Sequence, residues 1–459
     1  MWYCPSTAVS QRIAVFNMKE FFGKDLLLNS ESAKRIYETV KDLPIIDYHC
    51  HLDQNKIASD ASFSDIGELW LSGDHYKWRA MRLCGVNEHY ITGNANYKEK
   101  FLNYAEILPK MVGNALYYWT HMELSQIFGI KEPLNKESAE RIYAQANEKL
   151  KNITVSTLLK QYKVEYIATT DDPVDELNAH GKYAMTQVSP TFRPDKIYAL
   201  DGEYLEKLGK SAGVKIRMLS DLLTALEKRL DYFVSKGCRI SDHGFERFPK
   251  EYATQSEAEE YFQRKETLSA EEKDKLFGYL IVWLAKAYAK RNMIMQIHFA
   301  VIRNNNPEMF LRCGVDSGFD LIGEEQSVKD VVGFFAQLSD EERPETVLYT
   351  LNDSNLSALS AVTGAFRKVR MGAAWWFNDT VGGIRKNLKT IAEYSALGTS
   401  FGMLTDSRSF SSYARFDFFR RILSDHLGEL VEKGEYDFSA AKEIAKDICY
   451  NNIRSAING

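Results

Sequence analysis

The feature that most constrains the fold is the repeated alternation of short β-rich runs with long helical patterns. Parallel strands connected by crossover helices produce such an alternation. Eight candidate strands occur, at residues 43–48, 165–170, 196–200, 238–241, 294–297, 346–351, 370–375 and 400–404. Because eight strands close a (β/α)8 barrel, the sequence predicts an α/β protein of the TIM-barrel type.

The chain of 459 residues is longer than the roughly 250 that a plain barrel takes, so the surplus is expected in insertions. Helical patterns dominate residues 52–164, and we expect a helical insertion subdomain there, after the first strand. A smaller, charged insertion is expected at residues 246–275. Residues 1–17 show no amphipathic or signal pattern, and Met18 begins a stretch that resembles a natural protein start. We interpret residues 1–17 as a non-native or disordered extension and 18–459 as a single barrel domain.

The composition excludes several classes of function. A net charge of -5 does not favour a nucleic-acid partner. No apolar run approaches the roughly 20 residues that a membrane helix needs, so no membrane partner is expected. The six cysteines are scattered, with no CxxC pair, which favours a reducing compartment over a disulfide framework. We therefore expect a cytoplasmic protein.

Polar and titratable residues follow nearly every candidate strand. In a barrel of this type the active site lies at the carboxyl ends of the strands. The residues at these ends are His49, His51, Asp171, Asp172, Asp201, Asp242, His243, His298, Asn352, Asp353, Trp376, Asn378, Asp406 and Arg408.

His49 and His51 form the most informative pair. Residues two apart in an extended chain point the same way, so both imidazoles can face the barrel axis and hold one divalent ion. Asp406 ends the last candidate strand, which lies next to the first in a closed barrel, and is a natural third ligand. A pair of hydrogen-bonded structural histidines is the alternative. Cys50 points away between them and is expected to be a packing residue.

Four further features allow both a functional and a structural interpretation. His298 is a further ligand, a hydrogen-bond donor to substrate, or a core histidine. Asp242 is a site residue or part of a hydrogen-bonded turn. The donor-rich stretch 73–82 is a binding element or a helix start with a solvated face. Arg193 and Arg303 could each clamp a carboxylate in two hydrogen bonds, or take part in surface ion pairs.

Eight stretches, in order along nearly the whole chain, closely resemble uronate isomerases, a branch of the amidohydrolase superfamily. They are IIDYHCHL at 45–52, GDHYKWRAMR at 73–82, ATTDDP at 168–173, SPTFRPDK at 189–196, SDHG at 241–244, QIHFAVIRNNN at 296–306, GAAWWFND at 372–379 and TDSRSFSSYARFDFFRRIL at 405–423. The resemblance implies an aldose–ketose isomerisation of D-glucuronate to D-fructuronate, with D-galacturonate to D-tagaturonate as the companion reaction. It also implies a mononuclear site for a divalent metal, usually zinc, whose catalytic necessity varies.

The resemblance also implies roles for particular residues. His49, His51 and Asp406 would be the metal ligands. Our mechanistic hypothesis takes Asp406 as the base, because a carboxylate beside a cation can be held at the reaction centre, with Tyr76 and Arg408 as donors that stabilise the developing oxyanion. The residues around the open-chain sugar acid would be His75, Tyr76, Arg193, Asp242, His298, Arg303, Trp375 and Arg408. Arg193 would hold the C6 carboxylate.

Two rival functions use the same residues differently. A metal-dependent hydrolase of the same superfamily would activate water on an amide or ester, but no lysine stands at the end of the fourth candidate strand, where a carbamate-bridged binuclear site needs one. A non-catalytic sugar-acid binder would be expected to lose Asp406 or Tyr76, and both are present. We expect a small uronic acid as the partner, and a homo-oligomeric assembly.

Overall fold

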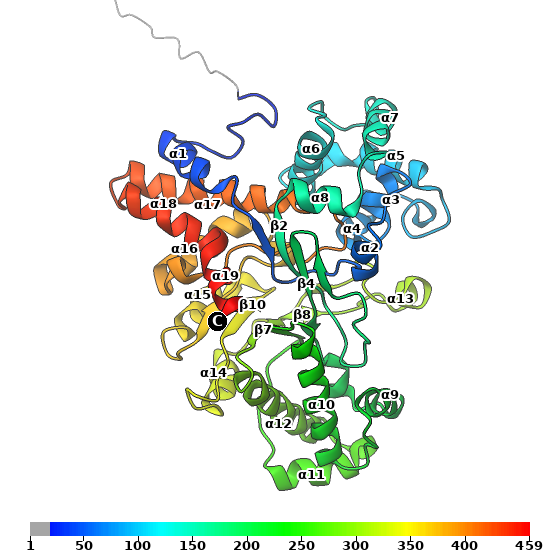
Figure 1. Cartoon of the computed structure of the whole chain (residues 1–459), viewed down its shortest axis with the longest axis vertical. Helices are drawn as coiled ribbons and strands as arrows, with labels where there is room; N and C mark the ends of the chain where they lie inside the picture. Colours follow the sequence, from blue (N-terminus) through cyan, green and yellow to red (C-terminus); the bar gives the residue numbers. More distant parts are fainter. Residues whose placement is uncertain (1–18) are drawn as a thin grey trace, which may run out of the picture.

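The computed structural model describes residues 19–459, and it shows a mixed α/β fold (Figure 1). The interpretation of residues 1–17 as an extension lies outside the described residues. The strands are β1 (Ile45–Asp47), β2 (Val164–Ala168), β3 (Gly181–Tyr183), β4 (Thr186–Ser189), β5 (Thr191–Phe192), β6 (Ile240–Gly244), β7 (Ile294–Phe299), β8 (Val301–Ile302), β9 (Leu321–Ile322), β10 (Thr346–Thr350) and β11 (Val369–Met371).

Two sheets of mainly parallel strands form the centre of the molecule. Their orders are β1-β2-β4-β3 and β11-β10-β7-β6-β5, while β8 and β9 form a separate antiparallel pair. In the two larger sheets every pairing is parallel except that of β3 with β4. A parallel bridge between Asp171 and Phe192 joins the sheets, so the strands follow one another continuously from β1 to β11.

The third strand differs from the prediction. The candidate at 196–200 is a 3-10 helix, η3 (Asp195–Ala199), which ends at Leu200 with a left-handed φ of 53°. The strand that pairs beside β2 lies earlier and consists of β4 and β5, separated by Pro190, which has no N–H to donate to a ladder. A short apolar run such as residues 196–200 does not distinguish a strand from a helical turn by its pattern.

The last strand also differs, since residues 400–404 form no strand. The N–H of Thr405 donates a hydrogen bond to the Asp47 side chain at 2.9 Å, and not to the backbone of a neighbouring strand. Gly402, in the same segment, has a left-handed φ of 67°. Backbone hydrogen bonds to the residues that follow β1 begin only at Asp406, whose N–H donates to the His49 carbonyl at 3.1 Å. Within residues 19–459 no ladder joins this segment to β11, so the hydrogen-bonded barrel is not closed.

Helices surround the sheets. They are α1 (Glu31–Val40), α2 (Gln54–Ala58), α3 (Ile66–Leu71), α4 (His75–Leu83), α5 (Tyr97–Ile107), α6 (Ala115–Phe128), α7 (Ala139–Leu150), α8 (Val155–Gln161), α9 (Gly202–Ala212), α10 (Leu219–Ser235), α11 (Gln255–Gln263), α12 (Ala270–Ala289), α13 (Pro307–Cys313), α14 (Val328–Ala336), α15 (Leu356–Val362), α16 (Val381–Tyr394), α17 (Ala414–Glu432), α18 (Phe438–Lys446) and α19 (Asn452–Asn458). Helices α5–α8 gather at one end of the molecule and α10–α12 project at the other (Figure 1).

Successive residues of the strands enter two different cores. One core, among the strands, contains Ile46, Tyr166, Ile240, Ile294, Val347, Phe401 and Leu404. Their chain neighbours pack outward with the helices in a larger core that includes Ile45, Ile167, Met295 and Leu348. Because both faces of these parallel strands are buried, strands such as β1, β7 and β10 are largely apolar, and polar side chains gather toward the strand ends.

Candidate active site

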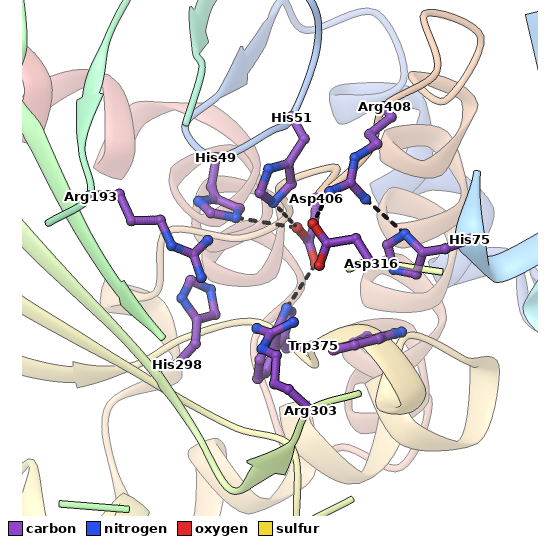
Figure 2. A pocket seen from close by; sticks show the side chains of 11 residues that line it. His49, His51, His75, Arg193, His298, Arg303, Asp316, Trp375, Asp406 and Arg408 are labelled. Carbon is purple, nitrogen blue, oxygen red and sulfur yellow. Dashed lines mark hydrogen bonds and ion pairs between the residues drawn. The ribbon is translucent and has the colours of Figure 1, made fainter. Parts of the chain in front are cut away.

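A cavity of about 150 Å³ opens at the carboxyl ends of the parallel strands, where ligands bind in α/β proteins (Figure 2). Its lining side chains are His49, His51, His75, Arg193, His298, Arg303, Asp316, Trp375, Trp376, Asp406 and Arg408. Nine of these were predicted from the sequence as site residues. The structure thus brings together residues that lie more than 350 positions apart in the chain.

Two predicted site residues lie beside the cavity and do not line it. Tyr76 stacks on the His75 ring, with ring centroids 4.9 Å apart, and Asp242 lies beneath the cavity floor with no exposed surface. Trp376 also lines the cavity and was expected only as a strand-end residue, whereas Asp316 was not predicted at all. Asp316 follows helix α13 and not a strand, so the strand-end rule could not identify it.

His49, His51 and Asp406 form the centre of the site. The Nε2 atoms of both imidazoles lie 3.2 Å from Oδ1 of Asp406. The alternation of an extended chain directs the two imidazoles to the same side, whereas the buried Cys50 between them faces the neighbouring strand, its Sγ 3.4 Å from the Ala168 carbonyl. One potential ligand atom from each of the three residues lies within 4.8 Å of the others, a spacing that could hold a metal ion.

Asp406 is held as a carboxylate. Burial by itself raises its pKa, but hydrogen bonds and charge from His49 and His51 outweigh burial and hold the pKa of Asp406 well below its usual range. The indole of Trp375 donates a further hydrogen bond to Oδ2 at 2.8 Å. Asp406 also has a left-handed φ of 44°, an uncommon backbone for a residue other than glycine, and such strain gathers at functional sites.

The two imidazoles have different electrostatic surroundings. Burial lowers the pKa of His51 to about 4, although Asp406 opposes this shift. Burial also acts to lower the pKa of His49, but the carboxylates of Asp242 and Asp406 outweigh it, and the pKa of His49 is raised. At neutral pH His51 is therefore a neutral imidazole, the form that binds metals.

Asp242, in β6, organises the floor of the cavity. Its carboxylate lies 2.6 Å from His298 Nδ1, 3.0 Å from Arg193 Nη1 and 3.8 Å from His49 Nδ1. Burial lowers the pKa of His298, so the neutral ring carries its proton on the Nδ1 that faces Asp242. Across residues 19–459, His298 Nε2 finds no hydrogen-bond partner, which leaves a lone pair for a ligand.

Helix α4 supplies His75 and Tyr76 at its first turn. Asp74 caps the helix by accepting from the N–H groups of Tyr76 and Lys77, which explains why the donor-rich stretch begins a helix at this residue. Burial raises the pKa of Tyr76 well above its usual range, so the phenol keeps its proton. Tyr76 is therefore a hydrogen-bond donor at neutral pH.

Each arginine of the cavity has a carboxylate partner. Arg193 contacts Asp195 at 2.9 Å as well as Asp242, and Arg303 contacts Asp320 at 3.1 Å. Arg408 is hydrogen-bonded to His75 Nδ1 at 2.8 Å and forms an ion pair with Asp316 at the same distance.

A buried network beneath Asp406 was missed by the sequence analysis. Asp47 accepts hydrogen bonds from the backbone and hydroxyl of Thr405, at 2.9 and 2.6 Å, and Arg415 donates to the Thr405 carbonyl at 2.8 Å. Arg415 is 1% exposed and lies 3.9 Å above the Trp119 ring. These contacts position the strained turn at Asp406, and their one sequence signal is a charged residue, Asp47, within an apolar strand.

The fold and the site define the class of protein: an α/β enzyme with a buried histidine–carboxylate centre at the carboxyl ends of parallel strands. The sequence model of the glucuronate isomerase family matches residues 18–456. The chain belongs to the glucuronate isomerase family.

Individual relatives agree with this membership. The uronate isomerase of Shouchella clausii is 42% identical, with 95% of this chain and 98% of that protein covered, and that of Caldanaerobacter subterraneus is 41% identical, with 95% and 99% covered. The crystal structure of uronate isomerase from Thermotoga maritima has a TM-score of 0.93 at 34% identity, covering 96% of this chain and all of that one. Glucuronate isomerase from Caulobacter crescentus has a TM-score of 0.89 at 25% identity, covering 95% and 97%. These comparisons favour the isomerase over the hydrolase that the sequence left as a rival.

Among residues 19–459, none of the helices combines the length and the apolar character that crossing a membrane requires.

Proposed function

We propose that this chain isomerises D-glucuronate to D-fructuronate, and D-galacturonate to D-tagaturonate, by moving a proton between C2 and C1 through a cis-enediol. One observation carries the proposal: the ionised carboxylate of Asp406 faces a donor-rich cavity in a chain of this family. A carboxylate whose orientation is held by hydrogen bonds is suited to accept a proton from carbon and to return it.

The proposed steps use the chain's own residues. Asp406 takes the proton from C2, the electron pair of that C–H bond becomes the C1=C2 double bond, and the carbonyl oxygen O1 takes up negative charge. Arg408 and the neutral phenol of Tyr76 donate to the oxygens that bear this charge. A proton moves from O2 to O1, and the Asp406 carboxyl returns its proton to C1, which leaves the ketone at C2.

The same centre fits a divalent metal, for which zinc is our choice. Two imidazoles and one carboxylate are a donor set that zinc accepts, and the Asp242 carboxylate near His49 Nδ1 is a partner of the kind that orients metal-bound histidines. His49, His51 and Asp406 would hold the ion. When bound, it would supply Lewis-acid polarisation of a substrate oxygen.

We assign the substrate carboxylate to Arg193. This residue lines the cavity, and its guanidinium is positioned by Asp195 and Asp242, so it can present fixed donors to a ligand. A fixed guanidinium favours a planar carboxylate over a neutral hydroxymethyl group, which would account for a preference for uronic acids.

We also propose that the two sheets and the segment at 400–407 form one eight-membered (β/α)8 barrel, with residues 52–164 as its helical insertion and 246–275 as a smaller one. The continuous parallel pairing from β1 to β11 and the backbone bonds of Asp406 and His51 across to the neighbouring segment support this arrangement. We also propose that the enzyme is a homo-oligomer and that it is located in the cytoplasm. The free thiols described for Cys50, Cys84, Cys238, Cys313 and Cys449 suit a reducing compartment.

Solvent exchange at C2 tests the role of Asp406. In deuterium oxide, the wild-type enzyme is expected to exchange the C2 proton of glucuronate, and Asp406→Asn is expected to abolish exchange and isomerisation while the circular dichroism spectrum is retained. An amide cannot accept the proton, which is the physical reason. Exchange at the wild-type rate in a folded Asp406→Asn enzyme would rule out Asp406 as the base.

A further inference from the structure

Asp316 lies in a long loop that extends to the cavity. The strands β8 and β9 pair antiparallel, Val301 with Ile322 and Ile302 with Leu321, and so close the base of a loop that contains residues 303–320. The loop includes α13 and then turns at Asp316, which has a left-handed φ of 55°. Figure 2 shows the Asp316 carboxylate beside Arg408, within the cavity.

Helix α4 holds the loop in place next to Asp316. Arg79 donates to the carbonyls of Gly318 and Asp320, at 3.2 and 3.1 Å, and Arg82 donates to the carbonyl of Ser317. Gly318 has a φ of 92° and approaches the His75 carbonyl so closely that a Cβ there would lie 3.0 Å from it. Asp316 is therefore positioned relative to the same helix that supplies His75 and Tyr76.

The hydrogen-bonding capacity of the cavity is unbalanced. Its arginines and Trp375 are donors, whereas its acceptors in the described part of the chain include the His298 Nε2 lone pair and two carboxylates, those of Asp316 and Asp406. An open-chain sugar acid carries several hydroxyl groups, each of which brings one O–H donor that needs an acceptor when it is buried. Asp406 already accepts from Trp375 and faces both imidazoles, so Asp316 is the carboxylate left for the hydroxyls.

Asp316 also has fewer hydrogen-bond partners and is more exposed than the other carboxylates at the site. Asp320 is 3% exposed and accepts from Arg303 and from the Asn304 backbone, and Asp242 is fully buried. The Asp316 side chain is 44% exposed, and its one side-chain partner in the described structure is Arg408. A half-exposed ion pair contributes little to stability, so its rearrangement around a ligand costs little.

We propose that Asp316 is a specificity-determining residue, which accepts hydrogen bonds from the hydroxyl groups of the bound sugar acid. When a polyhydroxy acid binds, Arg408 moves from Asp316 toward the oxygens of the ligand, and the freed Asp316 carboxylate accepts hydrogen bonds from the hydroxyl groups. A carboxylic acid without hydroxyl groups gains none of them, and it still competes with Asp316 for Arg408. The residue thus favours sugar acids over simple carboxylates. This inference rests on the proposed function.

Two unreactive acids of equal chain length test the inference: D-gluconate, which carries hydroxyls, and hexanoate, which carries none. Their inhibition constants would be measured for the wild type, Asp316→Asn and the matched control Asp25→Asn, at constant ionic strength. Asp25 is 33% exposed and forms a comparable single ion pair, with Lys34 at 3.0 Å, away from the cavity. Unfolding temperatures would establish that the variants are folded.

In Asp316→Asn, the inhibition constant of gluconate is expected to rise about tenfold, which corresponds to about 1.4 kcal/mol, because the hydroxyl groups lose a charged acceptor. The KM for glucuronate is expected to rise with it, while the constant for hexanoate stays the same or falls, and Asp25→Asn changes neither. Unchanged gluconate inhibition, or an equal change for both acids, would overturn the inference. Absence of isomerisation in the wild type would instead contradict the proposed function, whatever Asp316 does.

Discussion

At the scale of single residues, the charged side chains of the site are positioned by ion pairs and hydrogen bonds with one another. Asp242 illustrates this arrangement, since one buried carboxylate orients Arg193 and His298 and lies near His49. Burial alone raises the pKa of Asp242, yet His298, Arg193 and His49 together keep it well below its usual range. The groups that face the cavity are therefore oriented before a ligand binds, which lowers the entropy cost of binding.

Replacing Arg193 tests the carboxylate assignment. Arg193→Met is expected to raise the KM for glucuronate at least tenfold, because the buried substrate carboxylate loses a charged donor worth about 1.5–3 kcal/mol. Steady-state kinetics would measure KM and kcat together. Arg239→Met is the control, since Arg239 lies at the opposite end of the sheet, in the cavity that also contains Glu165 and Arg454. An unchanged KM in Arg193→Met would remove Arg193 from the carboxylate site.

A structural histidine in α6 predicts a pH dependence of stability. His121 is 2% exposed; its Nε2 accepts from the Leu134 N–H at 3.0 Å and its Nδ1 lies 2.8 Å from the Tyr117 carbonyl. Burial lowers the pKa of His121 to about 4, below its value of about 6.5 in an unfolded chain. The neutral ring therefore stabilises the fold above about pH 6.5, and this contribution is lost as the pH falls toward 4.

Comparison of the wild type with His121→Gln isolates this contribution. The wild type is expected to be the more stable at about pH 7.5, and its advantage in the free energy of unfolding should shrink by about 2 kcal/mol at about pH 5. Denaturant unfolding at both pH values measures the difference. An advantage that is the same at both would show that His121 does not titrate in this range.

At the scale of elements, helices α1 and α17 pack at very short range. Gly428 of α17 lies against Ala33 of α1, where an added Cβ would approach the Ala33 nitrogen to 2.5 Å. Polar contacts join the same two parts of the chain; for example, the Asn29 N–H donates to Oδ1 of Asp425 at 2.8 Å. Close helix packing thus joins the first and last parts of the described chain, and α1 and α17 lie side by side in Figure 1.

Two glycine-to-alanine changes separate helix propensity from packing. Alanine favours a helix by about 0.8–1 kcal/mol over glycine, so Gly382→Ala in α16, with no described atom within 4 Å of the new methyl, is expected to stabilise the protein slightly. Gly428→Ala is expected to destabilise it, because overpacking costs about 1–3 kcal/mol. Thermal unfolding of both variants measures the signs; stabilisation by Gly428→Ala would contradict the close packing described.

At the scale of the whole molecule, the active centre joins the first strand to the segment near residue 406. His49 and His51 follow β1, whereas Asp406 follows the last strand, β11, in the sequence. A metal ion held by these three residues would bind the folded state and not the unfolded chain. Ligands of this kind stabilise a fold by mass action.

Metal removal is therefore expected to lower stability as well as metal content. Chelation of the purified enzyme should remove about one divalent ion per chain and lower the unfolding temperature, and added zinc should restore both. Isomerisation of glucuronate and galacturonate would be assayed on the same samples. His51→Gln should bind less metal and respond less to the chelator. If the wild type keeps its unfolding temperature and activity after verified metal loss, His49 and His51 are better interpreted as substrate-positioning residues.

The sequence by itself determined the features that depend on local periodicity. Residues two apart share a face of an extended chain, so His49 and His51 were recognisable as a pair, and Cys50 as a residue that faces elsewhere. Polar residues directly after apolar strands identified five of the nine predicted side chains that line the cavity, and the family resemblance supplied the other four, His75, Arg193, Arg303 and Trp375.

Tertiary structure alone decided the contacts between distant segments. The pairing of Asp316 with Arg408 depends on how a loop lies against α4, and the turn at Asp406 depends on a bond from Asp47 to Thr405. No short-range pattern encodes either contact. The candidate strand at 196–200 proved to be a 3-10 helix because a short apolar run does not distinguish the two, and the candidate at 400–404 forms no strand, because the Asp47 side chain accepts from the Thr405 N–H. Local sequence places residues at the ends of strands, and only the packing of those strands decides which residues meet.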